Sequence, residues 1–426
     1  MKPKSYLSAA AASGAIAKGR LSAVDYISGF IDCIKKHNPT VCALSYWSES
    51  KVLEQSLAID SGFKTGALLG VPIAVKDNID VSGLPTGFGA DKSFHEHPST
   101  DANCVGLLKD AGAIIVGKAE TAEFAFLTPP PTRNPHNLAH TPGGSSSGSA
   151  AGVAAGMFPL ALGTQTGGST IRPASFCGVF GFKPTFGLVS RAGIKPFSES
   201  FDTVGWFGRH IEDIALLFSV LAPCSHDIEG INERGAPSAS LRLAFCPTPY
   251  WSKVEPALQN KIKNVARNLD ATQIELPFDM HQVSADLMYL ISIEMSRSLR
   301  VAYRLNADAL SSSLRKLIKD NLCVDYKKEL QARVRLERSR QQLDVLFEKY
   351  DALITPATTG AAPPTLEHTG DYVFNVAWTA LHVPCLSIPI GKNDANMPLG
   401  LQLVGPRYGD KRFLSLAHSV CAHLNI

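Results

Sequence analysis

The sequence has little net charge and no long apolar run. Its formal net charge is only +3 at pH 7 over 426 residues, which is too small to favour nucleic acid or an acidic membrane as a partner. The apolar stretch at residues 150–162 is short, rich in glycine and broken by Pro159, whereas a membrane-spanning helix needs about 18 apolar residues. We therefore expect a protein that binds neither nucleic acid nor a membrane and acts on a small molecule.

The sequence also lacks paired cysteines. Its nine cysteines are odd in number and scattered, and no two form a Cys-x-x-Cys pair. Such usage is typical of buried free thiols in a reducing compartment rather than of a disulfide framework. We therefore predict a cytoplasmic protein.

Helix-sized and strand-sized patterns alternate along a chain that is 45% hydrophobic and 19% charged. The short apolar run at 71–75 predicts a buried strand, and a helix at 105–109 is followed by a strand at 113–117. A helix at 148–156 and a strand at 158–163 repeat the order. This alternation favours an α/β fold with a single large mixed β-sheet flanked by helices on both faces.

A helix-rich segment is expected at about 250–350. Charge rises there, glycines become fewer, and long amphipathic stretches such as 325–350 appear. We interpret four arginines of the latter stretch as a solvated face rather than a docking patch: Arg333, Arg335, Arg338 and Arg340.

Strand patterns return after this helical segment, at 352–355, 385–390 and 399–404. No linker rich in proline, serine or charge separates them from the earlier strands, and there is no internal repeat. We therefore predict that these strands rejoin the sheet begun upstream, in a single domain of residues 1–426.

Small residues dominate the stretch from 141 to 190, which carries hardly a charge before Arg172. Glycine, alanine, serine and threonine let backbone N–H groups and hydroxyls approach a ligand closely, as a site for a developing oxyanion requires. The stretch holds two serine clusters but no histidine, and the nearest histidines are His136 and His140. A serine nucleophile here therefore needs a base from elsewhere.

Lys76 is a candidate for that base. It directly follows the apolar run at 71–75, and desolvation at the end of a buried strand lowers the pKa of a lysine enough to leave a neutral fraction. The alternative is an ordinary lysine at a strand end, paired with Asp77 or Asp80. From the residues alone both interpretations stay open.

Two segments resemble the amidase signature family: GVPIAVKDNIDV at 70–81 and PGGSSSGSAAGVAAGMFPLALGTQTGGSTIRPASFCGVFGFKP at 142–184. Shorter matches, LSAVDYI, TRNPHNLAHTPGG, DALITPAT and LGLQLVGPRYGD, extend the resemblance over most of the chain. A motif of this length with fixed internal spacing is highly specific. The resemblance implies the amidase signature fold and hydrolysis of carboxamides by a Ser-Ser-Lys triad.

The resemblance also implies the role of each triad residue. Ser169 takes the place of the nucleophile, Ser145 that of the bridging serine, and Lys76 that of the base. The 24-residue interval from Ser145 to Ser169 equals the spacing in the family. Family members hold the bridging serine in a cis peptide, which here is Gly144–Ser145.

The implied reaction passes through an acyl-enzyme and releases ammonia. Its oxyanion hole consists of the backbone N–H groups of Thr166, Gly167, Gly168 and Ser169. Neither a metal nor an organic cofactor is needed. A homodimer is implied by the resemblance alone.

Two positions depart from the commonest family pattern. Ser147 stands at a glycine position, which we interpret as neutral. Arg172 lies three residues after the nucleophile rather than two, an arrangement that resembles malonamidases and related small-amide hydrolases. We predict that Arg172 binds a carboxylate or similar polar group on a short substrate. The alternative is a structural arginine bonded to backbone carbonyls. By resemblance the compact apolar segment 123–135 lines the pocket, which favours a small substrate.

Three other functions remain open at this stage. Residues 144–148 match Gly-x-Ser-x-Gly, the nucleophile elbow of α/β-hydrolase esterases, with Ser146 as nucleophile and His418 or His423 late enough in the sequence. That elbow needs a strand directly before it, but residues 139–144 are typical of a loop.

The A subunit of a tRNA-dependent amidotransferase is the second. The position of Arg172, a chain somewhat shorter than usual for that subunit, and TQTGG in place of SDTGG argue against it. A glycine-rich nucleotide binder is the third, but the sequence has no Gly-x-x-x-x-Gly-Lys-Ser/Thr motif.

Overall fold

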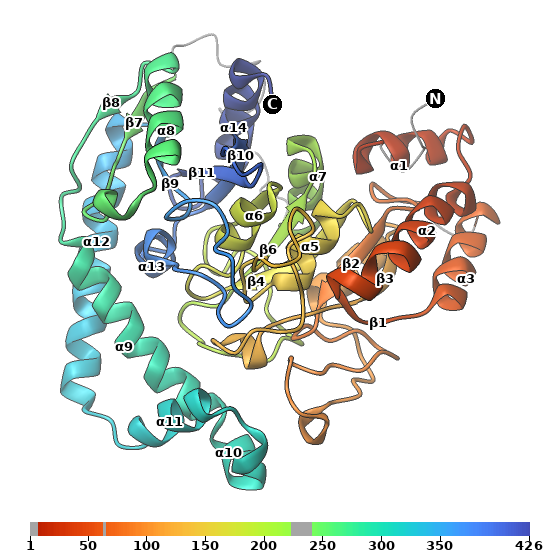
Figure 1. The fold of residues 1–426 in the computed structure, drawn as a ribbon, viewed down its shortest axis with the longest axis horizontal. Coiled ribbons are helices and arrows are strands. Elements are labelled where there is room, and N and C mark those ends of the chain that lie inside the picture. The colour runs from red at the N-terminus through yellow and green to blue at the C-terminus, as the bar shows by residue number, and fades with distance from the viewer. Residues whose placement is uncertain (1–6, 63–64, 223–240) are drawn as a thin grey trace.

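Eleven strands form one mixed sheet in the computed structural model, which describes residues 7–62, 65–222 and 241–426 (Figure 1). Their spatial order is β1-β3-β2-β4-β6-β5-β10-β11-β9-β7-β8. The strands are β1 (Leu44–Trp47), β2 (Pro72–Lys76), β3 (Ile114–Ala119), β4 (Leu160–Gln165), β5 (Phe180–Lys183), β6 (Thr203–Gly208), β7 (Leu243–Phe245), β8 (Thr272–Gln273), β9 (Ala352–Pro356), β10 (Cys385–Lys392) and β11 (Pro398–Val404).

Parallel and antiparallel pairs alternate in blocks across this sheet. The neighbours β3, β2 and β4 are parallel, as are β9, β7 and β8, whereas the pairs from β4 through β6, β5, β10 and β11 to β9 are antiparallel. The sheet therefore confirms the predicted mixed α/β architecture.

Helices cover both faces of the sheet (Figure 1). They are α1 (Ala9–Ala17), α2 (Ala23–Val41), α3 (Glu49–Asp60), α4 (Asn103–Asp110), α5 (Ser147–Ala154), α6 (Ile171–Cys177), α7 (Ile211–Leu221), α8 (Pro256–Asn268), α9 (Met280–Ser298), α10 (Arg300–Asn306), α11 (Ser312–Asp320), α12 (Tyr326–Lys349), α13 (Val373–Ala380) and α14 (Asp410–Leu424).

Alternate residues of the central strands pack into different cores. On β4, Leu160 and Leu162 join the apolar cluster of α4, α7 and α14, whereas Ala161 joins that of α2, α5 and α6. Successive side chains of a strand point to opposite faces, so both faces of β4 are buried. The neighbouring strand β2 is buried along its whole length and ends in Lys76.

The structure confirms the strand and helix positions expected from the sequence, with shifted boundaries. The run at 71–75 becomes β2, and the pattern at 148–163 becomes α5 followed by β4. Five helices, α8 to α12, fill the segment between 256 and 349, and the strands before and after it belong to the same sheet. The single domain over residues 1–426 stays a prediction.

The solvated arginine face expected on α12 is wrong for three of its four arginines, whereas Arg338 is exposed as expected. Arg333 pairs with Glu294 of α9 at 2.6 Å, and Arg335 pairs with Asp286 of α9 at 2.6 Å. Arg340 donates to the carbonyl of Ala380 at the end of α13. Because an arginine reaches far from its own helix and carries five donors, these side chains dock α12 against its neighbours, and α9 and α12 lie side by side in Figure 1.

The eight cysteines of the described ranges are free thiols, five of them buried, and the ninth, Cys224, lies outside those ranges. No described helix is both long and apolar enough to cross a membrane. Nor do the described residues contain a cluster of three or more histidine, cysteine or acidic side chains placed to hold a metal ion.

Candidate active site

Lys76 is buried at the end of β2 without an acidic partner. Its side chain is 0% exposed, and Nζ lies 2.8 Å from Ser145 Oγ and 2.8 Å from Thr164 Oγ1. No described carboxylate is within ion-pair distance of it. Burial lowers the pKa of Lys76 from 10.5 to about 7, and the charge of Asp202 opposes that shift. Lys76 is therefore present in large part as a neutral amine near neutral pH.

Ser145 lies in the loop before α5, where its hydroxyl faces Lys76. The Gly144–Ser145 peptide bond is cis, and the Ser145 carbonyl accepts from the backbone N–H of Ala122 at 3.1 Å. Gly143 has a φ of 82°, and a Cβ there would lie 2.8 Å from Pro173 Cα. Only glycine combines that conformation with so close a contact.

Ser169 lies in the turn between β4 and α6 and is 9% exposed. Its carbonyl accepts from the backbone N–H of Ser146 at 3.4 Å, so its main chain adjoins the loop that carries Ser145. Within the described residues, the N–H groups of Gly167, Gly168 and Ser169 donate to no acceptor. A row of unpaired donors beside a serine suits the binding of an oxyanion.

Sequence reasoning missed three polar residues around this lysine: Thr164, Asn78 and Asp202. Thr164 Oγ1 bonds to Lys76 and also accepts from Asn78 Nδ2 at 3.2 Å. The parallel register that places Val75 of β2 beside Leu162 of β4 brings Thr164 next to Lys76. Thr164 could have been found from the sequence, because it is a polar residue directly after the predicted strand at 158–163.

Asp202 left no comparable signal in the sequence. It lies just before β6, where its carboxylate accepts from the N–H groups of Phe197 at 2.7 Å and Ser198 at 2.9 Å. Thr166 Oγ1 donates to it at 2.5 Å. Burial raises the pKa of Asp202 to about 6, whereas these hydrogen bonds lower it. We call residues 166–169 the oxyanion loop. Through its hydrogen bond from Thr166, the carboxylate of Asp202 connects this loop to the segment that precedes β6.

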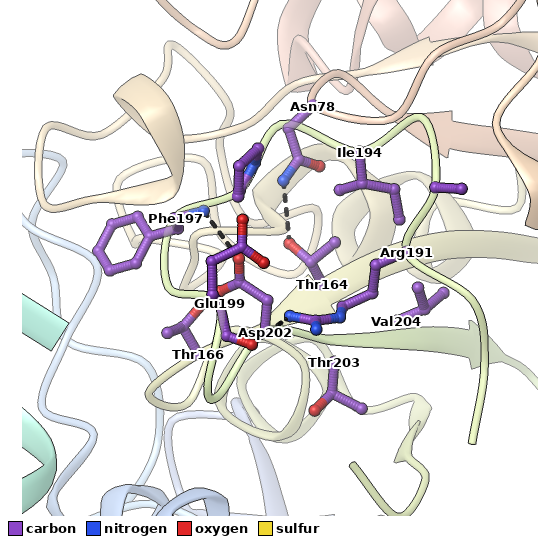
Figure 2. A pocket seen from close by; sticks show the side chains of 12 residues that line it. Asn78, Thr164, Thr166, Arg191, Ile194, Phe197, Glu199, Asp202, Thr203 and Val204 are labelled. Atoms are coloured by element: carbon purple, nitrogen blue, oxygen red, sulfur yellow. Dashed lines mark hydrogen bonds between the residues drawn. The ribbon is translucent and has the colours of Figure 1, made fainter. Parts of the chain in front are cut away.

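A cavity of about 340 Å³ opens beside these residues (Figure 2). Asn78, Thr164, Thr166 and Asp202 contribute polar groups to its wall. The remaining lining residues are Arg191, Ala192, Ile194, Pro196, Phe197, Glu199, Thr203 and Val204. Lys76, Ser145 and Ser169 do not line this cavity, which therefore adjoins the triad rather than contains it. The expectation that segment 123–135 lines the pocket is wrong for this cavity, because residues 191–204 form most of its wall.

Arg172 is 4% exposed and already holds three partners. Its guanidinium donates to the carbonyls of Gly370 at 2.7 Å and Gly144 at 2.5 Å, and to Thr369 Oγ1 at 3.0 Å. Its Nε finds no partner among the described residues, and the ring of Tyr372 lies 5.0 Å from Cζ. Burial lowers the pKa of Arg172 to about 10, so the side chain is charged at neutral pH.

Ser146, the nucleophile of the alternative esterase hypothesis, lies in a setting that does not suit a nucleophile. It is fully buried, its hydroxyl donates to the carbonyl of Thr164 at 3.1 Å, and no strand precedes it in residues 139–144. His418 lies on α14 beside Glu212. The arrangement therefore lacks the strand and the exposed serine of a nucleophile elbow. Ser147, at the family's glycine position, donates to the carbonyl of Gly143 at 2.7 Å.

Comparison with known proteins agrees with this fold. Residues 25–414 match the Amidase family. A relative from Symbiobacterium thermophilum, named as the A subunit of glutamyl-tRNA(Gln) amidotransferase, is 34% identical to this chain, over 96% of this chain and 95% of that protein. The chain therefore belongs to the Amidase family and is a hydrolase acting on carbon–nitrogen bonds.

Solved structures support the same assignment. One, described as a vestigial protein complex that reveals the origins of an s-triazine catabolic enzyme, superposes with a TM-score of 0.88 at 27% identity, over 99% of both chains. Another, described as an amidase, gives a TM-score of 0.87 at 27% identity over 98% of this chain and 99% of the other.

Proposed function

We propose that the protein hydrolyses a small carboxamide to a carboxylate and ammonia, with Ser169 as nucleophile, Ser145 as proton relay and Lys76 as base. One observation carries the proposal: Lys76 is wholly buried, pairs with no acidic side chain of the described residues and contacts the hydroxyl of Ser145 at 2.8 Å. A lysine in that setting is a proton acceptor near neutral pH rather than a fixed cation.

The proposed acylation uses the contact of Lys76 with Ser145. The described residues show no hydrogen bond between the hydroxyls of Ser145 and Ser169, so the second proton transfer is part of the proposal. The Lys76 amine takes the proton of Ser145, and Ser145 takes that of Ser169, whose oxygen bonds to the amide carbon. The carbonyl oxygen becomes an oxyanion, which is bound by the N–H groups of Thr166, Gly167, Gly168 and Ser169, none of which donates to a described acceptor. One such donor typically contributes about 3 kcal/mol to transition-state stabilisation.

Acylation is completed when the proton returns along the same path. The Lys76 ammonium gives its proton through Ser145 to the amide nitrogen, the carbon–nitrogen bond breaks, and ammonia leaves an ester on Ser169. Deacylation begins when water attacks the ester carbon and gives one proton to Lys76. That proton returns to Ser169 as the ester bond breaks, and the carboxylic acid leaves and loses its own proton to solvent. No step requires a metal or an organic cofactor.

The role of Arg172 decides the substrate class. Two of its three hydrogen bonds go to backbone carbonyls, which supports the structural alternative, and the Gly144 carbonyl links it to the loop of Ser145. Binding of a substrate carboxylate stays a prediction, in which the unpartnered Nε and the adjacent Tyr372 ring face the acid end. The two roles differ in which substrates Arg172→Ala affects.

The A subunit of a tRNA-dependent amidotransferase is a second candidate, favoured by the names of the curated relatives. The match covers 95% of the relative from S. thermophilum, so almost the whole subunit has a counterpart in this chain. The position of Arg172, the shorter chain and Gln165 in the TQTGG motif are the sequence features that favour a separate amidase. We keep the cytoplasm as the proposed location and a homodimer as the proposed assembly.

Ammonia release by the purified chain, without partner subunits or ATP, tests the proposal. We expect turnover of small amides by the wild type and none by Ser169→Ala. If neither releases ammonia from any small amide, whereas activity appears with partner subunits and ATP, the amidotransferase function replaces the one proposed.

The same panel resolves Arg172. It contains amides with and without a carboxylate, and it is run on the wild type and on Arg172→Ala. A loss confined to the carboxylated amides supports anion binding. An equal loss of kcat on all amides supports a purely structural role.

A further inference from the structure

We propose that Gln165 and Thr379 are positioning residues that fix the orientation of the Gly167–Gly168 peptide in the oxyanion loop. This inference rests on the proposed function, because it assigns a role within the same site. It concerns two buried side chains whose hydrogen bonds within the described residues go to none of the three triad residues.

The orientation of the Gln165 amide is determined by its surroundings. Gln165 is the last residue of β4 and is 0% exposed. Its Oε1 accepts from the backbone N–H groups of Thr170 at 2.9 Å and Ile171 at 3.0 Å, which directly follow the nucleophile. Backbone N–H groups can only donate, so the amide nitrogen Nε2 must face the other way, toward Thr379 Oγ1 at 3.1 Å.

The single proton of the Thr379 hydroxyl then has one destination. Because Thr379 Oγ1 accepts from Gln165 Nε2, its own proton is free to be donated, and the carbonyl of Gly167 lies 2.9 Å away. A carbonyl can only accept. This series of hydrogen bonds therefore begins at the backbone N–H groups of Thr170 and Ile171 and ends at the backbone carbonyl of Gly167. These backbone groups set the direction of every hydrogen bond in the series.

A fixed Gly167 carbonyl fixes the N–H of Gly168. In a trans peptide the C=O and N–H groups point in opposite directions. Since Thr379 draws the carbonyl toward α13, the Gly168 N–H points away from α13. Glycine has the freest backbone of all residues, so a Gly-Gly peptide without this restraint can turn its carbonyl toward the oxyanion instead.

Helix α13 is packed closely enough to act as that restraint. A Cβ on Gly168 would lie 2.5 Å from Asn375 Oδ1 and 2.9 Å from Tyr372 Cβ, and one on Gly167 would lie 3.4 Å from the Tyr372 ring. Tyr372, Asn375 and Thr379 are spaced to lie on one face of a helix. The oxyanion loop thus rests against that face of α13.

A carboxylate at position 165 cannot do the same work. It has no N–H to donate, so the hydroxyl of Thr379 would donate either to the carboxylate or to Gly167. The neutral amide removes that choice. Gln165→Glu therefore keeps the size of the side chain while it removes the directionality.

The test compares four variants: Thr379→Val, Thr379→Ser, Gln165→Glu and, as a matched control, Thr358→Val. Thr358 is buried, donates to the carbonyl of Gly360 at 2.7 Å and lies 3.2 Å from Ser175 Oγ. Its hydroxyl therefore makes the same pair of bonds as that of Thr379, but away from the oxyanion loop. The measurements are kcat and KM on the best amide, the rate at which an alkyl fluorophosphonate labels Ser169, and Tm.

We expect Thr379→Val to lower kcat and the labelling rate by ~10- to 100-fold, the range below full loss of one oxyanion donor, with KM within about twofold of the wild type. Thr379→Ser should restore both rates, and Gln165→Glu should lower both. Thr358→Val should lower Tm as much as Thr379→Val but leave kcat and labelling unchanged.

Equal kcat and labelling in Thr379→Val and the wild type overturns the inference, as does a loss matched by Thr358→Val or not restored by serine. Labelling separates this result from failure of the proposed function. If the wild type is labelled at Ser169 but cleaves no amide, the proposed reaction fails, and the labelling rates alone decide the inference. If the wild type is not labelled at Ser169, both are wrong.

Discussion

Replacing the base of the triad should make the protein more stable while it abolishes activity. Lys76→Met keeps a side chain of similar length at a site that is 0% exposed but removes the ionisable amine. Burial lowers the pKa of Lys76 from 10.5 to about 7, so folding either removes the proton of this lysine or buries its charge. That shift is a cost to stability.

The cost follows from the two pKa values. One pKa unit corresponds to ~1.4 kcal/mol, so the penalty is ~5 kcal/mol well below pH 7, ~4 kcal/mol at pH 7 and ~2 kcal/mol at pH 9. It is fully present below the folded-state pKa and disappears as the pH rises toward the unfolded-state value. Methionine loses the bonds to Ser145 and Thr164, at ~1 kcal/mol each. The expected net gain is ~3 kcal/mol at pH 6 and about zero at pH 9.

Urea unfolding at pH 6 and pH 9 measures this gain. Lys118→Met is the matched control, because Lys118 is equally buried but pairs with Asp77 at 3.1 Å. Its loss leaves a buried carboxylate unpaired, which costs about 3–5 kcal/mol.

The lowered pKa of Lys76 would be refuted if Lys76→Met is less stable than the wild type at pH 6. It would also be refuted if the gain in the free energy of unfolding grows with pH. Stabilisation by Lys118→Met would refute the contrast between the two lysines.

Three further outcomes follow from the site. In the wild type, kcat/KM should rise with pH through about 7 as Lys76 loses its proton. Asp202→Asn should move this rise to lower pH, because the Asp202 charge favours the ammonium form of Lys76. A pH profile that does not move, or that moves to higher pH, contradicts the electrostatic coupling of the two residues. Gly168→Ala should lower kcat at least tenfold, with KM nearly unchanged, because its Cβ would lie 2.5 Å from Asn375 Oδ1; steady-state kinetics showing full activity would mean that the loop tolerates a Cβ. Ser146→Ala should retain turnover, because the Ser146 hydroxyl bonds to the backbone of β4; loss of activity with an unchanged Tm would restore the esterase alternative.

The position of Lys76 could be predicted because local sequence determines it. An apolar run that ends in Lys76 places the lysine at the end of a buried strand, and the structure has that strand as β2. Long motifs of small residues carried the resemblance to the family, and the match over residues 25–414 confirms it.

Contacts made by long or distant side chains could not be predicted in the same way. Asp202 reaches the oxyanion loop through Thr166 only because β6 pairs with β4, and no local pattern marks that pairing. The sequence places Arg172 near the nucleophile, but the direction of its guanidinium depends on the loop at 369–372, almost 200 residues away. The arginines of α12 were misread for the same reason, since their acidic partners lie on other turns and helices.

Capture of the acyl-enzyme tests the central claim most directly. The enzyme is mixed with a small amide that it cleaves, quenched with acid during turnover, digested and examined by mass spectrometry. The account predicts an acyl group on the peptide that contains Ser169 in the wild type, and none in Lys76→Ala. An acyl group on Ser146, or equal acylation of Ser169 in Lys76→Ala, would contradict it.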